Sequence, residues 1–134
     1  MGARVSAFLA DACALIDFYT GEPTFPPPLR ALFESRSPSI AVTATTAWEI
    51  AIKTARGKLV DIRDPEFGTL AEMLSAEGYV LLPFDHATAE QAASLPLLHR
   101  DPFDRALVAT AQRTGRTVLT WDPSIALYGV PVRW

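Results

Sequence analysis

The chain has 134 residues, which corresponds to about one domain at roughly 150 residues per domain. Its 12 basic and 15 acidic residues give a net charge of −3, which argues against a broad cationic surface for duplex nucleic acid. The single cysteine excludes a disulfide framework or a cysteine-rich zinc site and indicates a reducing compartment, so we expect a cytoplasmic protein. No apolar run reaches the length of about 18 residues that a membrane helix requires.

Short apolar segments alternate along the chain with segments of helical spacing. Near the C-terminus, Phe103, Leu107, Val108 and Ala111 recur at intervals that place them on one face of a helix. This alternation predicts an α/β fold with a central parallel sheet of four to five strands and helices on both faces. The predicted strands are 5–10, 39–43, 79–83 and 117–120, with 130–133 as a further edge strand, and the predicted helices are 13–19, 29–35, 46–56, 65–76 and 102–114.

Acidic residues occur at corresponding points of these segments. They follow the first strand, lie in the first turns of the helix after the second strand, open the last long helix and follow the fourth strand. In a parallel sheet, the carboxyl ends of strands and the amino ends of helices share one edge, where ligands bind. We therefore expect the following carboxylates to converge: Asp11, Glu49, Asp101, Asp104 and Asp122.

Helix capping offers an alternative explanation for most of these acids. Residues 46–49 form a capping-box pattern, in which the glutamate at the end bonds back to the first amide. Asp101 and Asp122 each precede a proline, as N-cap residues often do. Asp104 would be stabilised at the third helical position by the helix dipole. Asp11 is the hardest to explain in this way, because it directly follows a buried segment in which a polar group needs partners.

A cluster of these acids would need a cation. Carboxylates held close together raise one another's pKa unless a positive charge neutralises them. Oxygen ligands without histidine or cysteine suit Mg²⁺ or Mn²⁺ rather than zinc. Such ions activate water and stabilise the charge that develops in phosphoryl chemistry. The pattern therefore predicts a divalent-cation site for phosphoryl transfer or hydrolysis.

Four motifs occur in order along the chain, over residues 8–16, 46–53 with 57–59, 99–109 and 118–122. Together they resemble the PIN-domain family, and within it the VapC-type ribonuclease toxins of bacterial toxin–antitoxin pairs. The third motif, which begins at His99, is the most specific. The resemblance implies one PIN-like nuclease domain over residues 1–134 that hydrolyses RNA with Mg²⁺ or Mn²⁺ and a metal-activated water. It also implies a homodimer and a cognate VapB-like antitoxin. Because no apolar run is long enough to span a membrane, no membrane partner is expected.

The catalytic acids of the family correspond to Asp11, Glu49, Asp104 and Asp122. The resemblance assigns the metal ion to Asp11, Asp104 and Asp122, with Glu49 completing the site or orienting the attacking water. Asp104 matches the third acid better than Asp101 does, because a helix of small residues follows it directly. Asp101 is kept as an alternative ligand.

One position departs from the family pattern. The family commonly has a hydroxyl residue after the first aspartate, and this chain has Ala12 there, followed by Cys13. Loss of a hydroxyl that supports a metal ligand typically costs about 10- to 100-fold in metal affinity. Thr120, before the fourth acid, fits the pattern and is expected to support the site. Cys13 is expected to be a small buried apolar residue rather than a nucleophile.

Basic and aromatic residues near the acids are candidates for binding RNA. Lys53 and Arg105 are the candidate phosphate contacts, although each also has a carboxylate partner available four residues earlier in its helix. Trp48 and Trp121 adjoin two of the acids. Stacking of their rings on RNA bases is one interpretation, but packing in the core or at a dimer interface is the better one for both. The two histidines, His86 and His99, lack the spacing of metal ligands and are expected to be structural or capping residues.

Other functions fit these residues less well. The first strand is not followed by a glycine-rich motif, which argues against a dinucleotide-binding oxidoreductase. A receiver-like, Mg²⁺-binding phospho-acceptor domain usually has paired acids after the first strand, whereas Asp11 stands alone. A non-catalytic PIN domain that binds protein or RNA remains an alternative because of Ala12.

Overall fold

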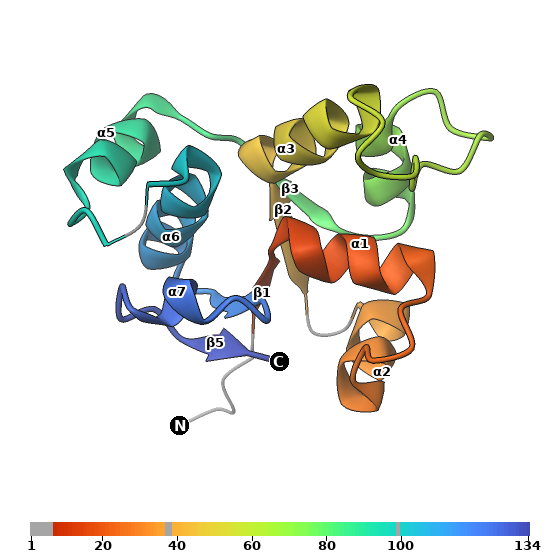
Figure 1. The fold of residues 1–134 in the computed structure, drawn as a ribbon, viewed down its shortest axis with the longest axis horizontal. Helices are drawn as coiled ribbons and strands as arrows, with labels where there is room; N and C mark the ends of the chain where they lie inside the picture. The colour runs from red at the N-terminus through yellow and green to blue at the C-terminus, as the bar shows by residue number, and fades with distance from the viewer. Residues whose placement is uncertain (1–6, 37–38, 99) are drawn as a thin grey trace.

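The computed structural model describes residues 7–36, 39–98 and 100–134. Five strands form one parallel sheet in the order β3-β2-β1-β4-β5 (Figure 1). The prediction of a parallel sheet is thus confirmed, including the edge strand near the C-terminus. The expected first strand began at residue 5, and its first two residues lie outside the described ones. The strands are β1 (Phe8–Ala10), β2 (Ile40–Thr43), β3 (Val80–Leu82), β4 (Thr117–Leu119) and β5 (Val132–Arg133).

Helices cover both faces of the sheet, because successive residues of each strand point to opposite sides. Phe8 and Ala10 of β1 pack with α1, α2 and α4, whereas Leu9 packs with α6 and α7. In Figure 1 the first group lies to the right of the sheet and the second to the left. The helices are α1 (Ala12–Thr20), α2 (Pro27–Ser35), α3 (Ala44–Ala55), α4 (Leu70–Ala76), α5 (His86–Ser94), α6 (Pro102–Thr114) and α7 (Pro123–Ala126).

Several helices differ from the prediction, among them α2, which begins at Pro27 rather than at residue 29, and the short α7, which was not predicted. Helix α5 was not predicted, because it consists mainly of alanine and polar residues and buries only Thr88 and Ala92. Helix α4 begins at Leu70 rather than residue 65, because the hydroxyl of Thr69 accepts a hydrogen bond from the Glu72 amide and caps it there. Helix α3 begins two residues earlier than expected, which has a consequence for Glu49 described below. None of the helices within the described ranges is long and apolar enough to cross a membrane.

Candidate active site

The strand order sets the position of the site. From β1 the chain proceeds to β2 and β3 on one side, then returns past β1 to place β4 and β5 on the other side. The connections after β1 and after β4 therefore diverge to opposite faces, and a crevice opens outside the carboxyl ends of these two strands. Asp11 follows β1 directly, and its backbone N–H donates to the carbonyl of Leu119 in β4 at 3.1 Å.

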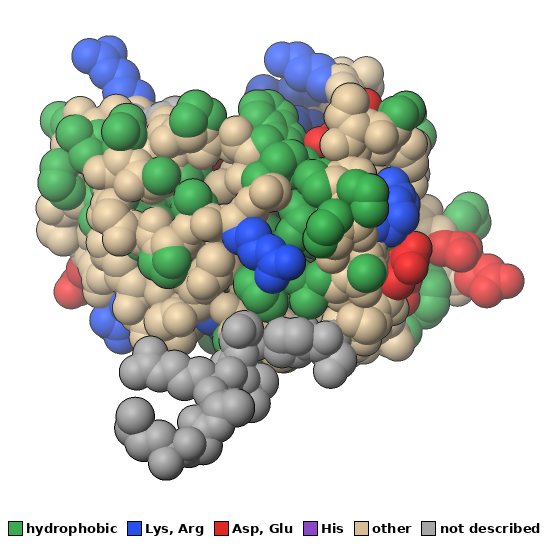
Figure 2. Space-filling view, turned by 90° about the horizontal axis from the view of Figure 1, so that it is seen from below, with side chains coloured by type: hydrophobic (Ala, Val, Ile, Leu, Met, Phe, Trp, Pro, Cys, Tyr) green, Lys and Arg blue, Asp and Glu red, His purple; other side chains and the backbone are tan. Residues whose placement is uncertain are grey.

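A pocket of about 290 Å³ lies in this crevice. Four separate parts of the chain contribute to it: the start of α1, the middle of α3, the start of α6 and the segment after β4. All five predicted carboxylates line it, as does Lys53. The lining residues are Asp11, Cys13, Ile16, Asp17, Glu49, Lys53, Asp101, Asp104, Trp121 and Asp122. Figure 2 shows the opposite end of the molecule, where the visible acidic side chains lie at the left and right of the view.

The Asp11 carboxylate is fixed by several donors. The Ala12 amide donates to Oδ1 at 2.7 Å, and the Thr120 hydroxyl donates to Oδ2 at 2.8 Å. The thiol of Cys13 lies 3.5 Å from both Oδ2 and the Thr120 hydroxyl. Burial raises the pKa of Asp11, and the hydrogen bonds from Thr120 and Ala12 oppose this shift. Thr120, which was expected to support the site, thus holds Asp11 by a hydrogen bond. The same hydroxyl accepts a hydrogen bond from the Asp122 amide at 3.0 Å.

Asp104 lies in the first turn of α6 with 8% of its surface exposed. Its pKa is raised to about 7, first by burial and then by the negative charges of the four other carboxylates. This electrostatic coupling is the consequence of placing the acids of separate segments at one pocket. At neutral pH, Asp104 is therefore poised between its protonated and charged forms. The neighbouring carboxylates that act on it are Asp101, Asp11, Asp122 and Glu49.

Glu49 accepts a hydrogen bond through Oε2 from Lys53 Nζ at 2.9 Å. The expectation of a capping box over residues 46–49 is wrong, because α3 begins at Ala44 and this segment lies inside the helix. Burial raises the pKa of Glu49 against the opposing effect of Lys53, and the bond to Glu49 raises the pKa of Lys53. The i, i+4 pair predicted from the sequence is therefore present, and it lies at the pocket.

Two further acids, Asp101 and Asp122, each cap a helix and also line the pocket. Asp101 accepts from the Phe103 amide at 2.9 Å and is the N-cap of α6, as predicted. Asp122 accepts from the amide of Ser124 at 2.9 Å and from its hydroxyl at 2.7 Å, and is the N-cap of α7. Both side chains nevertheless line the pocket. Capping thus orients these carboxylates at the edge where the helices begin.

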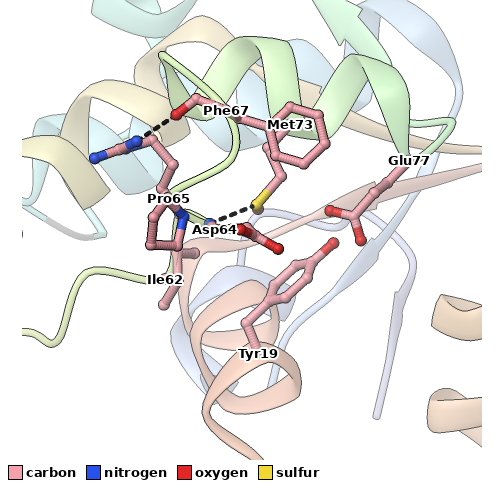
Figure 3. A pocket seen from close by; sticks show the side chains of 8 residues that line it. Tyr19, Ile62, Asp64, Pro65, Phe67, Met73 and Glu77 are labelled. Carbon is pink, nitrogen blue, oxygen red and sulfur yellow. Dashed lines mark hydrogen bonds between the residues drawn. The ribbon is translucent and has the colours of Figure 1, made fainter.

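A second pocket, of about 590 Å³, lies beside α1 and α4 and contains none of the predicted acids (Figure 3). Its lining includes Tyr19, Asp64 and Glu77, and the Asp64 amide donates to the sulfur of Met73 at 3.3 Å. Its residues come from α1, the segment before α4 and α4's end, away from the carboxyl ends of β1 and β4. The acidic pocket is therefore the candidate active site.

A sequence model of the PIN domain family matches residues 8–130. The chain belongs to the PIN domain family. Solved structures with the same fold include a toxin–antitoxin complex from Klebsiella pneumoniae, with 20% identity, a TM-score of 0.64 and coverage of 94% of this chain and 95% of that one. A VapBC complex from Rickettsia felis bound to a DNA fragment from its promoter has 12% identity, a TM-score of 0.68 and coverage of 96% and 98%.

A third structure with this fold is a VapC toxin from Mycobacterium tuberculosis described as cleaving the sarcin–ricin loop. It has 13% identity and a TM-score of 0.66, with coverage of 92% of this chain and 95% of that one. A search of curated proteins found no match. Membership of the PIN domain family rules out the receiver-like interpretation of the acidic cluster.

The donor chemistry of the PIN-domain pocket fits a hard divalent cation. Its carboxylates supply oxygen ligands, and their mutual repulsion, evident in the raised pKa of Asp104, would be relieved by positive charge. Within residues 7–36, 39–98 and 100–134, however, no three His, Cys, Asp or Glu side chains are already grouped tightly enough to hold an ion. Mg²⁺ usually keeps several of its waters and needs only one or two direct carboxylate ligands, so the other acids would hold it through water.

Two expectations for this PIN domain require correction. Arg105 is buried, and its guanidinium is committed to the carbonyls before α6, so the geometry does not support a phosphate contact. Cys13 is not a buried core residue but is half-buried at the pocket. Burial and the charge of Asp11 raise the pKa of its thiol to about 12, so it stays protonated. The carbonyls that Arg105 contacts belong to Ala92, Ala93, Leu95 and Pro96.

The aromatic and histidine predictions have separate outcomes. Trp48 and Trp121 are 61% and 55% exposed, so core packing is wrong for both. Trp48 lines an apolar groove between α3, α5 and α6 rather than the acidic pocket. His86 is the exposed first residue of α5 and does not line the acidic pocket. His99 lies outside the described residues.

Sequence reasoning missed one acid of the pocket. Asp17 lies on α1, six residues after Asp11, and its Oδ2 accepts from the indole N–H of Trp121 at 3.1 Å. The available signal was helical spacing, because Asp17 lies one turn beyond Cys13 and so shares its face. Ala12, by contrast, is fully packed in the core and does not line the pocket, so its missing hydroxyl leaves no gap there.

Proposed function

We propose that this PIN domain is a divalent-metal-dependent endoribonuclease, the toxin of a VapBC-type toxin–antitoxin pair. The observation that carries the proposal is the pocket in which Asp11, Glu49, Asp104 and Asp122 converge from separate segments. The raised pKa of Asp104 supports it, because such a cluster is electrostatically unfavourable without a cation. Similarity of fold to the VapC toxin described above supports RNA as the substrate.

In this proposal, Asp11, Asp104 and Asp122 hold Mg²⁺ or Mn²⁺ through their carboxylate oxygens, with Asp101 as an alternative ligand. The ion would supply an activated water and offset charge on the phosphate oxygens during hydrolysis. Thr120 and the Ala12 amide orient Asp11 by their hydrogen bonds to its two oxygens. Glu49 binds Lys53 through Oε2, which leaves Oε1 to orient the attacking water.

Lys53 is the candidate phosphate contact at this pocket. Its side chain is 46% exposed, and its ammonium group lies beside the acids rather than on a remote surface. When Lys53 donates to an RNA phosphate instead of to Glu49, the Glu49 carboxylate would be released. A small cationic contribution of this kind is compatible with the net charge of −3, because the metal ion adds positive charge locally.

The proposed partners are RNA, a VapB-like antitoxin and a second copy of the chain, acting in the cytoplasm. The toxin–antitoxin complexes among the similar structures support the antitoxin. Coexpression with the product of a small adjacent gene should yield a stable complex that loses ribonuclease activity. Repeated purification of the chain alone from such cells would contradict the toxin assignment, and light scattering would measure the homodimer separately.

The test of catalysis is Asp104→Asn. We expect it to abolish Mg²⁺-dependent cleavage of RNA while leaving a cooperative, native-like melting transition. The matched control is Asp64→Asn, which makes the same charge change at an exposed residue outside the acidic pocket and should retain full activity. Undiminished cleavage by Asp104→Asn would remove Asp104 from the catalytic set. Absence of EDTA-sensitive cleavage by the native protein would favour the non-catalytic PIN domain instead.

A further inference from the structure

Trp121 is a large apolar side chain exposed at the edge of the acidic pocket. It lines that pocket and is 55% exposed. Its two neighbours in sequence are both fixed, since the Thr120 hydroxyl binds Asp11 and Asp122 caps α7. The backbone of Trp121 is therefore held on both sides by groups of the candidate active site.

The indole ring is also held by its own polar edge. Its Nε1 donates to Asp17 Oδ2 at 3.1 Å, which joins the segment after β4 to helix α1 across the pocket. Asp17 is the one lining acid that neither caps a helix nor belongs to the predicted catalytic set. This bond fixes the ring at its edge and leaves its π-faces free of that interaction.

The other two tryptophans differ from Trp121 in this respect. Trp48 packs edge-on against Phe103, with ring centroids 5.2 Å apart, and Trp134 packs against Phe25 at 5.3 Å. In the part of the chain that the structure describes, no aromatic ring or cationic side chain packs on the Trp121 indole. Trp121 is thus held at its edge by Asp17, and among the described residues its ring carries no aromatic or cation–π contact, next to the acids.

We propose that Trp121 stacks on an unpaired base of the RNA, next to the phosphate that enters the acidic pocket, and that Asp17 positions the indole for this contact. The inference rests on the proposed function and specifies its substrate as single-stranded or locally unpaired RNA. A base in a duplex has both π-faces covered by its neighbours, whereas an unpaired base exposes a face to a fixed ring. Stacking of this kind tolerates any base and selects for strand conformation.

The test measures tryptophan fluorescence as an RNA oligonucleotide binds. The probe is a 12-nucleotide oligouridylate with Mg²⁺, in the Asp104→Asn background so that it stays intact, as a gel would verify. We expect quenching that Trp121→Phe removes, because this variant lacks the reporting indole. Trp48→Phe and Trp134→Phe are the matched controls and should retain the quenching. The same strand annealed to oligoadenylate should quench much less.

Affinity provides a second readout. Replacement of Trp121 by Leu should weaken binding of the single strand about 5- to 100-fold, because base–aromatic stacking is lost. Trp121→Phe should lose less, because a phenyl ring still stacks. An oligonucleotide with abasic central positions should bind native and Trp121→Leu proteins equally. Quenching that survives in Trp121→Phe, or equal affinity of the native and Leu proteins for the intact strand, would overturn the proposal.

Asp17 is tested as a positioning residue by two variants of equal charge. Asp17→Asn keeps a carbonyl acceptor for the indole N–H, whereas Asp17→Ala removes it. We expect Asn to retain the single-strand affinity and Ala to lose part of it, with equal melting temperatures. Equal affinities of the two variants would contradict the positioning role. Because these measurements do not require cleavage, a protein that binds through Trp121 but does not cleave RNA would refute the proposed function alone.

Discussion

The hydroxyl of Thr120 and the carboxylate of Asp11 form a 2.8 Å hydrogen bond between residues 109 positions apart in the sequence. The bond joins the carboxyl ends of the two central strands, β1 and β4, which pair directly. The same hydroxyl accepts from the Asp122 amide, so one oxygen orients two of the proposed metal ligands.

Replacement of Thr120 by Val should therefore weaken both the fold and the site. Val has nearly the same shape but cannot donate to Asp11, so we expect a loss of about 1–3 kcal/mol in the free energy of unfolding. Affinity for Mn²⁺ should fall about 10- to 100-fold, as is typical when a group that orients a ligand is removed. Thr120→Ser keeps the hydroxyl and serves as the control in denaturant titrations and calorimetry. Native-like Mn²⁺ affinity in the Val variant would contradict the role of this bond.

Mn²⁺ should stabilise the native protein, and more strongly at higher pH. A cation must displace the proton of Asp104, whose pKa is about 7, so binding should tighten as the pH rises through this value. The increase in melting temperature on adding Mn²⁺ should accordingly be larger at pH 8 than at pH 6. An ion present at 100 times its dissociation constant adds about 2.7 kcal/mol. A shift of equal size in Asp104→Asn, or a shift independent of pH, would refute this coupling.

The metal-free protein should show the opposite trend. The folded-state pKa of Asp104, about 7, lies above its ordinary value of 3.8, so the folded state binds the proton more tightly than the unfolded state. Its contribution to stability is complete below about pH 4 and is lost as the pH rises through 7. In EDTA, the melting temperature of Asp104→Asn minus that of the native protein should therefore increase between pH 4 and 7. A difference that stays constant over this range would show that Asp104 has an ordinary pKa.

Arg105 should be a stability residue rather than an RNA contact. Its guanidinium donates to four backbone carbonyls at 2.8–3.3 Å, two near the end of α5 and two in the loop that follows it. Lys has one compact ammonium group and cannot reproduce the set of hydrogen bonds that the planar guanidinium makes. Arg105→Lys should therefore lower the free energy of unfolding by about 2 kcal/mol or more. Arg113→Lys, at an exposed position of the same helix, is the control. Unchanged stability together with weaker RNA binding would restore the phosphate contact predicted from the sequence.

The sequence was sufficient to predict the sheet and the convergence of the acids, because both depend on local periodicity and on the geometry of parallel strands. It could not predict α5, whose alanines give no apolar face and whose position depends on the carbonyl contacts of Arg105. The role of Arg105 could not be predicted either, because two of the carbonyls that it contacts belong to this unpredicted helix. From the sequence, its position beside Asp104 indicated substrate, whereas in the structure its side chain points to the preceding loop.

Side-chain partners across the pocket were likewise beyond sequence reasoning. Asp17 and Trp121 are 104 positions apart, and their bond depends on the direction in which α1 leaves the sheet. The assignment of Glu49 to a capping box failed because the start of α3 is set by Thr43 at the end of β2. Helix ends and contacts between distant residues are determined by tertiary packing, to which local patterns are insensitive.

The pairing of β1 with β4 has a consequence for the order of events during synthesis. Asp11 is among the first residues to be synthesised. The strand β4, which completes the crevice, and Asp122 beyond it follow more than a hundred residues later. Until then the early acids have no partners from the last part of the sheet, and Thr120 is not there to orient Asp11. An unfinished polypeptide on the ribosome therefore lacks the assembled acidic crevice until β4 and Asp122 have left the ribosome.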